Sequence, residues 1–377
     1  MAGIYIHIPF CKQACSYCNF HFATSLRRKN ELVSALLSEM DLRKDYLNDE
    51  PVETIYFGGG TPSLLPSKDH RALIEKIYSA FNVSQEAEIT LETNPDDISD
   101  GKLREWKEAG INRLSIGIQS FFEEDLKWMS RAHNAEQAAN SLRAAVKQFH
   151  NITVDLIYGT PLLTNEKWKT NVERAMKEGV VHLSCYALTV EPKTPLQKLI
   201  KKQKAADIDP DKQSEQFLLL MEWMEEARYE HYEISNFARP GCRSKHNSSY
   251  WQGKKYLGIG PSAHSFDGSV RQWNISNNNI YLDSIKKETI PLEKEVLTAT
   301  QKLNEYIMTS LRTIEGLDLN RVEDVNGDRL RTTSRKFIEG GLMAEENGHL
   351  RLTREGKLLA DGIAAKLFFE EPKMIKS

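Results

Sequence analysis

Six short apolar runs alternate with amphipathic stretches over the first part of the chain. The runs are Ile4–Ile8, Thr54–Phe57, Ile89–Glu92, Arg113–Ile118, Thr153–Ile157 and Leu183–Leu188. Apolar residues at helical spacing lie between and after them, near 30–47, 68–81, 100–109, 122–147, 166–178 and 211–229. Strands that alternate with helices predict a parallel sheet. Six such units fall short of the eight of a closed barrel, so we expect an open, partial (β/α)6 barrel over residues 1–235.

The rest of the chain predicts a smaller unit that follows a connecting segment, residues 236–290. Within residues 291–377 the pattern indicates a helix over Glu295–Thr313 and another near 329–339. A hairpin over Leu342–Leu352, with an Asn347-Gly348 turn, precedes a final helix over Thr353–Phe369. The expected fold class is therefore α/β, with a small C-terminal α+β, winged-helix-like domain that serves as a lid or docking unit.

The charge balance argues against nucleic acid as a partner. The chain carries 50 basic and 53 acidic residues, with a pI near 6.4, and shows no basic recognition face. No run of about 18 apolar residues predicts a membrane span, which leaves only peripheral contact open. The N-terminus lacks the pattern of a signal peptide, and cysteines are few, so we expect a cytoplasmic protein. The sequence does not indicate an oligomeric state.

Cys11, Cys15 and Cys18 form a C-x3-C-x2-C cluster directly after the first predicted strand. Iron–sulfur clusters are held by cysteine thiolates at short spacings. Three thiolates on a cube of four irons leave one iron open to a small chelating molecule. A zinc site with His7 or His21 as the fourth ligand is the alternative. Cys185 and Cys242 are isolated, and we expect them to be small buried residues.

Polar or glycine-rich groups recur where the predicted strands end, which is where parallel sheets place their chemistry. Gly58–Pro62 follows the second strand and either exposes N–H donors to a ligand or forms a tight turn. Glu92 ends the third strand and Gln119 the fourth. Asp155 lies in an apolar strand and needs a partner, for which Arg131 is a candidate unless it is a surface helix residue.

His246-Asn-Ser-Ser-Tyr-Trp251 is a second notable motif, in a loop after the predicted barrel. Imidazole is a common ligand of haem iron, and Tyr and Trp offer flat apolar faces to a macrocycle. From chemistry alone, a loop that packs two aromatic side chains on the barrel is the simpler interpretation. His264, in a later polar turn, is an alternative ligand.

The cysteine pattern, with Tyr17 before the last Cys, resembles the radical S-adenosylmethionine (SAM) superfamily. In that family a 4Fe–4S cluster binds the amino and carboxylate groups of SAM at its open iron, and one electron from the reduced cluster cleaves SAM to a 5′-deoxyadenosyl radical. The resemblance implies that the glycine-rich stretch meets the SAM amino group and Glu92 the ribose hydroxyls. The implied SAM-site residues are Tyr5, Tyr17, Gly59, Gly60, Thr61, Glu92, Gln119, Arg131 and Asp155. An electron donor is then an expected partner.

The whole chain resembles the oxygen-independent coproporphyrinogen oxidase family. The stretches that carry this resemblance are Tyr5–Cys11, Gly58–Pro62, Ser115–Phe121, Arg131–His133, Val154–Gly159 and Leu257–Ser265. The family divides into a true oxidase and HemW relatives, which are proposed haem chaperones. Three features favour the second group. Phe20 stands where the oxidase has a fourth Cys, only ten residues precede Cys11, and the 246–251 motif is intact.

This resemblance implies that the protein binds a 4Fe–4S cluster, SAM and haem. It also implies that His246 binds the haem, and that haem passes to an acceptor apo-protein, for which the respiratory chain is the expected source. The alternative is SAM-dependent oxidative decarboxylation of coproporphyrinogen III. A radical SAM transferase acting on an unrelated substrate would need its own substrate-binding domain, and the sequence shows none. No catalytic residue is assigned.

Overall fold

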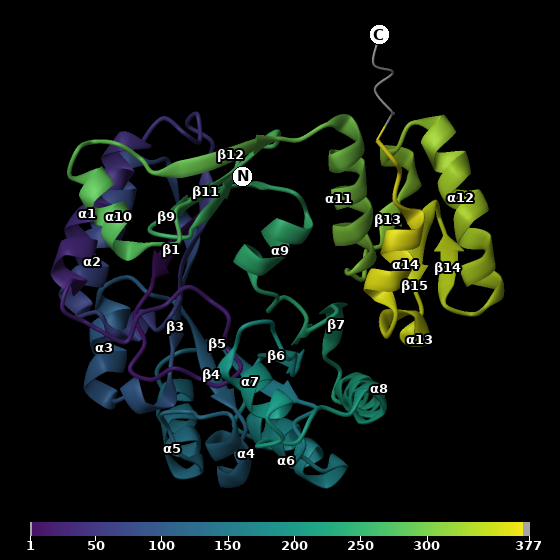
Figure 1. Cartoon of the computed structure of the whole chain (residues 1–377), viewed down its shortest axis with the longest axis horizontal. Coiled ribbons are helices and arrows are strands. Elements are labelled where there is room, and N and C mark those ends of the chain that lie inside the picture. Colours follow the sequence, from purple (N-terminus) through teal and green to yellow (C-terminus); the bar gives the residue numbers. More distant parts are fainter. Residues whose placement is uncertain (1, 372–377) are drawn as a thin grey trace.

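The computed structural model describes residues 2–371, and its centre is a parallel sheet (Figure 1). Six parallel strands follow one another in chain order: β1 (Ala2–Ile8), β2 (Val52–Gly59), β3 (Val83–Thr93), β4 (Arg113–Gln119), β5 (Asn151–Tyr158) and β6 (His182–Ala187). They confirm the six predicted strands. The edge strands of this sheet are not paired with each other in the described part of the chain, so the barrel is open, as expected.

Helices cover the outer face of these strands (Figure 1). Those that pack into the main core are α1 (Lys29–Leu42), α2 (Ser67–Ala80), α3 (Asp100–Glu108), α5 (Ala135–Val146), α6 (Asn165–Lys177) and α8 (Pro210–Glu226). The short helices α4 (Glu123–Trp128) and α7 (Pro195–Lys201) instead share a smaller apolar cluster with Tyr17 of the cysteine loop. Successive side chains of a strand point to opposite faces of a sheet. In β1 this alternation buries Ile4, Ile6 and Ile8 in the main core and turns Tyr5 to the other face, beside Tyr56 of β2.

Strands that the sequence analysis did not predict extend both edges of the sheet. β7 (Glu230–Glu233) and β8 (Asn236–Ala238) add antiparallel strands beside β6. β9 (Lys255–Ile259) lies parallel to β1, and β10 (His264–Phe266), β11 (Val270–Asn274) and β12 (Leu292–Val296) follow as antiparallel strands. The segment 236–290 therefore contributes strands to the main sheet. The domain boundaries proposed at 235 and 290 stay predictions.

A buried carboxylate anchors this extension to α1. Glu39 accepts hydrogen bonds from the Gly260 amide at 2.8 Å and from the Asn274 amide group at 2.7 Å. It also accepts one from the hydroxyl of Tyr281, in α10 (Asn278–Ile285), and lies 3.7 Å from Arg43. Buried charges are normally paired and hydrogen-bonded in this way. Glu39 thus ties the loop after β9, the strand β11 and the helix α10 to one helix of the barrel.

The C-terminal domain has a core of its own, which includes Ile307, Leu330 and Leu350. Its elements are α11 (Ala299–Leu311), β13 (Leu317–Asp318), α12 (Asp324–Glu339), β14 (Met343–Glu346), β15 (His349–Leu352), α13 (Arg354–Lys357) and α14 (Ala360–Leu367). Asn347 and Gly348 have φ values of 52° and 78°, which is the backbone that a tight hairpin turn requires. The predicted hairpin is confirmed, and the domain is a small α+β unit.

Four predicted elements were wrong in detail. The helix expected over 122–147 is two helices, because Ser130 has a φ of 57° and Asn134 begins α5 with a capping box. The final helix is likewise divided into α13 and α14, and residues 292–296 form β12 rather than a helix start. The 246–251 stretch is the helix α9 (Lys245–Trp251), not a loop, because the Ser244 side chain caps its first turn. In residues 2–371, no helix is long and apolar enough to cross a bilayer.

Candidate functional site

Cys11, Cys15 and Cys18 lie in the loop after β1, and none of them forms a disulfide. All three are half-buried. The pKa of Cys11 is raised to about 11, mainly by burial and in smaller part by the neighbouring Cys18 and Cys15 thiols. The three sulfur atoms are thus close enough to repel one another as thiolates. A bound cation of high charge removes this penalty, so the loop fits an iron–sulfur cluster.

The two imidazoles suggested as a fourth zinc ligand are hydrogen-bonded elsewhere. In residues 2–371, no three His, Cys, Asp or Glu side chains are grouped so as to hold one metal ion. The His7 ring nitrogens lie 3.1 Å from the Tyr5 hydroxyl and 3.1 Å from the His21 carbonyl oxygen. The His21 Nε2 atom lies 2.7 Å from Asn278 Oδ1. Both imidazoles suggested as a fourth zinc ligand thus have other partners.

Arg131 lies in the turn between α4 and α5, not on a surface helix. Its Nη1 atom lies 3.4 Å from the Cys15 sulfur and 3.4 Å from the Tyr17 hydroxyl oxygen. Its Nη2 atom donates to Asn94 Oδ1 at 2.7 Å and to the Gly117 carbonyl at 2.8 Å. The guanidinium therefore joins the cysteine loop to the ends of β3 and β4.

Arg131, the candidate partner of Asp155, does not contact it directly, although its positive charge partly opposes the burial that raises the pKa of that carboxyl group. Asp155 instead accepts a hydrogen bond from the Ser115 hydroxyl of the neighbouring strand, at 3.2 Å. Burial raises the pKa of Asp155 to about 6, and the hydroxyls of Ser115 and Ser184 partly oppose this shift. A raised pKa makes the carboxyl group easier to protonate, which lowers the cost of keeping it in an apolar strand without an ion pair.

Of the two alternatives for the glycine-rich stretch, exposed N–H donors and a tight turn, the hydrogen bonds favour the turn. The Gly59 amide donates to Glu92 at 3.2 Å, the Gly60 amide to the Ile8 carbonyl at 2.9 Å, and the Thr61 amide to the Phe10 carbonyl at 2.6 Å. A Cβ atom at Gly60 would lie 2.6 Å from that Phe10 carbonyl oxygen, which requires glycine. Because these amides are already bonded, the stretch would bind a ligand through its backbone carbonyl oxygens, which accept hydrogen bonds from an amino group. The Thr61 hydroxyl contacts the Cys11 sulfur at 3.6 Å.

Glu92 and Gln119 mark the ends of β3 and β4. The Tyr56 hydroxyl donates to Glu92 at 2.8 Å, and burial raises the pKa of Glu92 to about 7. Gln119 is buried and has a φ of 65°, an unusual backbone for a residue that is not glycine. Such strain is typical of functional sites. The structure brings Gly59, Glu92 and the Arg131 turn to the same edge of the sheet as the cysteines, as predicted. Tyr5 lies in the middle of β1, away from this edge.

His246 lies at the opposite end of the barrel interior. It is 1% exposed, and its amide donates to Glu88, near the start of the buried part of β3. Its Nδ1 lies 2.8 Å from the Thr54 hydroxyl oxygen and its Nε2 lies 2.9 Å from the Tyr250 hydroxyl oxygen. Burial lowers the pKa of this imidazole to about 3, so it is neutral at physiological pH. Ligation of iron by His246 would require one of these hydrogen bonds to break.

A chain of contacts joins Glu92 to α9. The Tyr56 hydroxyl binds Glu92, and the Tyr56 ring stacks on His246 with ring centres 4.8 Å apart. His246 in turn contacts the Tyr250 hydroxyl. His264, the alternative ligand, lies exposed on β10 and stacks on Trp273.

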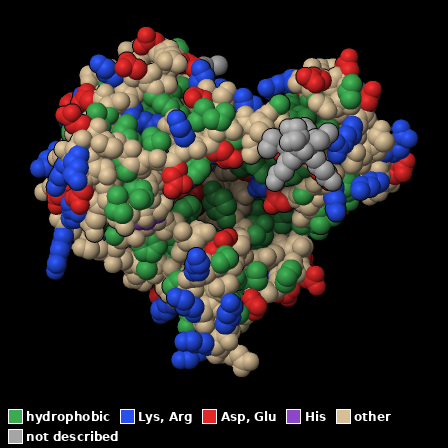
Figure 2. All heavy atoms as spheres, turned by 45° about the horizontal axis from the view of Figure 1, so that its top comes forward, with side chains coloured by type: hydrophobic (Ala, Val, Ile, Leu, Met, Phe, Trp, Pro, Cys, Tyr) green, Lys and Arg blue, Asp and Glu red, His purple; other side chains and the backbone are tan. Residues whose placement is uncertain are grey.

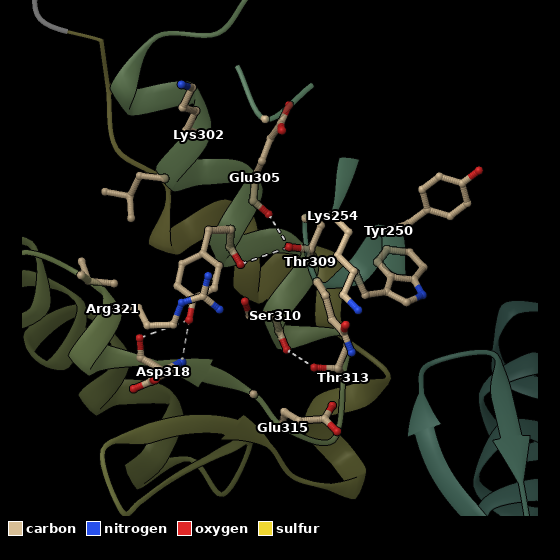
Figure 3. Close-up of a pocket in the computed structure, with 18 of the residues that line it drawn as sticks. Tyr250, Lys254, Lys302, Glu305, Thr309, Ser310, Thr313, Glu315, Asp318 and Arg321 are labelled. Atoms are coloured by element: carbon tan, nitrogen blue, oxygen red, sulfur yellow. Dashed lines mark hydrogen bonds between the residues drawn. The ribbon is translucent and has the colours of Figure 1, made fainter. Parts of the chain in front are cut away.

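A groove of about 850 Å³ separates α9 from the C-terminal domain (Figures 2 and 3). Figure 2 shows it as a hollow with hydrophobic side chains in its depth and charged ones around it. Tyr250 and Trp251 line one side, and the other side includes Tyr306, Arg321 and His349. This groove was not predicted from the sequence, because these C-terminal residues carry no motif and stand far from α9 in the sequence.

Known proteins resemble the chain over nearly its whole length. Residues 5–175 match the Radical SAM superfamily, and residues 297–359 match the HemN C-terminal domain. The chain is 33% identical to a Bacillus subtilis protein named heme chaperone HemW, over 96% of this chain and 98% of that protein. The Mycobacterium tuberculosis and Escherichia coli proteins of the same name are 32% and 31% identical, over 97% and 98% of this chain and 94% and 98% of theirs.

Among solved structures, the coproporphyrinogen III oxidase HemN of Escherichia coli, a radical SAM enzyme, shares the fold. It matches with a TM-score of 0.83 over 97% of this chain and 90% of that chain, at 22% sequence identity. The open barrel is therefore of the radical SAM type.

Proposed function

We propose, from the premise that this chain belongs to the HemW family, that it is a haem chaperone, which binds haem and passes it to an acceptor apo-protein. The observation that carries this proposal is the likeness of at least 31% identity, over nearly the full length of both chains, to proteins named heme chaperone HemW. The thiol ligands of its cluster need a reducing compartment, so we place its action in the cytoplasm.

In this proposal Cys11, Cys15 and Cys18 hold a 4Fe–4S cluster, and SAM lies beside it. When bound and reduced by an electron donor, the cluster supplies one-electron chemistry toward SAM. The carbonyl oxygens of Gly59 and Gly60 would accept from the SAM amino group, and Glu92 from the ribose hydroxyls. Arg131, which contacts the Cys15 sulfur and Tyr17, would balance the negative charge of the thiolates.

The remaining assigned residues support this site from the neighbouring strands. Gln119, in its strained backbone, and Asp155 would complete the wall that faces SAM, and Tyr5 would form its floor. Because hydroxyl groups donate to an ionised carboxylate, SAM would bind better above the Glu92 pKa of about 7 than below it.

The alternative, a coproporphyrinogen oxidase, has the fold in its favour. One residue favours the chaperone function. Phe20, at the position where the oxidase pattern has a fourth Cys, is 67% exposed. A phenylalanine side chain has no atom that can bind iron, so this position cannot supply the fourth ligand of the oxidase pattern.

One oxygen-free experiment separates the two functions. The full chain, reconstituted with iron and sulfide, is divided between two assays. In the first it is titrated with haem, and we expect saturable binding. In the second it receives SAM, a reductant and coproporphyrinogen III, and we expect no protoporphyrinogen. Formation of protoporphyrinogen over many turnovers would favour the oxidase and contradict the proposal.

A further inference from the structure

We propose that haem lies in the groove between α9 and the C-terminal domain, with Nε2 of His349 as a ligand of its iron. This inference rests on the proposed function, because it assumes that the chain binds haem. It departs from the sequence-based assignment, which gave the iron to His246.

The groove has the size and the walls that a porphyrin needs. Its volume of about 850 Å³ falls within the range of ligand sites. Aromatic side chains line both sides: Tyr250, Trp251 and Tyr256 on the barrel side, and Tyr306 and Phe369 on the C-terminal side. Flat apolar rings of this kind pack well against a planar macrocycle.

His349 is the only histidine among the described residues that line the groove. Its Nδ1 lies 3.2 Å from the backbone carbonyl oxygen of Asn347. A carbonyl oxygen only accepts, so Nδ1 carries the hydrogen, and the neutral ring leaves the Nε2 lone pair available. Metal-binding histidines are typically oriented in this manner by a partner at the other ring nitrogen.

The surroundings of this Nε2 atom are compatible with a metal. Its nearest charged partner, Asp318 Oδ2, is 4.0 Å away, and the His349 side chain keeps 29% of its surface exposed. His246 differs on both counts, since it is 1% exposed and each of its ring nitrogens contacts a hydroxyl group.

The groove also carries cations that are suited to the two haem propionates. Arg243 and Arg271 are already paired, with Glu315 at 2.6 Å and Glu305 at 2.7 Å respectively. Arg321 and Lys302 have no carboxylate at ion-pair distance among residues 2–371. Figure 3 shows both on the C-terminal side of the groove, and Arg321 stacks on the Tyr306 ring at 4.7 Å. Such cations are good partners for carboxylate groups.

His246 then acts as a positioning residue. Its hydrogen bond fixes the hydroxyl of Tyr250, whose ring lines the groove. In Figure 3 this hydroxyl points away from the groove, which leaves the ring as the contact surface.

The test is an oxygen-free titration of the reconstituted full chain with ferric haem. It compares the wild type with His349→Ala, with His246→Ala, and with His264→Ala as the control for an exposed histidine outside the groove. We expect His349→Ala to bind haem about tenfold or more weakly and to lose the spectral signature of imidazole-bound iron. Added imidazole should restore that signature. The other two variants should keep it.

A second probe reports on the groove without an iron bond. Metal-free protoporphyrin IX should bind the wild type and His349→Ala alike, and should bind Arg321→Gln more weakly. An unchanged spectrum and affinity of His349→Ala for haem would overturn the inference, as would loss of the imidazole signature in His246→Ala alone. If the wild type binds no haem at all, the proposed function fails instead.

Discussion

The His246 Nε2 atom and the Tyr250 hydroxyl oxygen lie 2.9 Å apart, one turn from each other in α9. The His246 side chain points into the barrel and stacks on Tyr56, whereas the Tyr250 ring faces the groove. The motif thus connects two regions. One contains the SAM-site candidate Glu92, and the other is the proposed haem groove.

Replacing His246 should cost stability before it affects haem. In His246→Ala the hydroxyl groups of Thr54 and Tyr250 lose their partner inside the protein. Two buried polar groups and a cavity together are expected to lower the free energy of unfolding by about 2–4 kcal/mol. Urea unfolding of the apo-protein measures this change. A variant as stable as the wild type would show that these contacts do not hold α9 in place.

Loss of one thiol from the N-terminal loop should abolish the cluster. Cys18→Ala leaves only two cysteine ligands, so anaerobic reconstitution should retain almost no iron and sulfide. Cys242→Ala is the matched control, since Cys242 is also a free, half-buried thiol but lies outside the loop. Iron and acid-labile sulfide analysis checks both variants. Equal iron and sulfide in the two variants would exclude the cysteine loop as the cluster site.

Arg131 should raise the reduction potential of the cluster. Its guanidinium donates toward the Cys15 sulfur, and a positive charge there stabilises the more negative, reduced form. We therefore expect Arg131→Met to shift the potential to more negative values, by tens of millivolts. Arg143→Met, at an exposed position of α5, should leave it unchanged. Redox titration without SAM decides this, and equal potentials in the two variants would refute the assignment.

The raised pKa of Glu92 should be visible in the pH dependence of stability. Burial raises this pKa from 4.5 to about 7 in the folded protein. Between those values the folded protein holds a proton that the unfolded chain has released, so the free energy of unfolding falls as the pH rises. Asp155, with a pKa of about 6, acts in the same direction.

Glu92→Gln removes this titration while keeping an oxygen acceptor for Tyr56. Its stability relative to the wild type should therefore grow from pH 5 to pH 7.5, by at most about 3 kcal/mol. Urea unfolding of both apo-proteins across this range is the measurement. Parallel stability curves would mean that Glu92 titrates normally.

Sequence patterns predicted the parts of this fold that depend on local periodicity. The alternation in β1 and the apolar spacing of α1 are local, and the site residues at the ends of β2, β3 and β4 follow from the rule for parallel sheets. The pairing of β9 with β1 is not local, because it joins the N-terminal residues 2–6 to residues 255–259.

The errors at the site have the same origin. Arg131 was assigned to a helix, because the pattern over 122–147 does not reveal that Ser130 turns the backbone. The sequence could not decide whether the Gly60 and Thr61 amides are free, because their partners, Ile8 and Phe10, are distant in sequence. The groove could not be predicted for a similar reason. Its walls come from α9 and from the C-terminal domain, which are brought together only when the two domains pack against each other.

Transfer of haem to an acceptor is the defining property of a haem chaperone and can be measured. The reconstituted full chain, loaded with haem and freed of excess, is mixed without oxygen with an apo-cytochrome of the respiratory chain and an excess of apo-myoglobin as a scavenger. We expect the cytochrome to gain its holo spectrum despite the scavenger, whereas free haem in the same mixture goes to myoglobin. If the cytochrome gains no more haem from the loaded chain than from free haem, the protein does not act as a haem chaperone toward this acceptor.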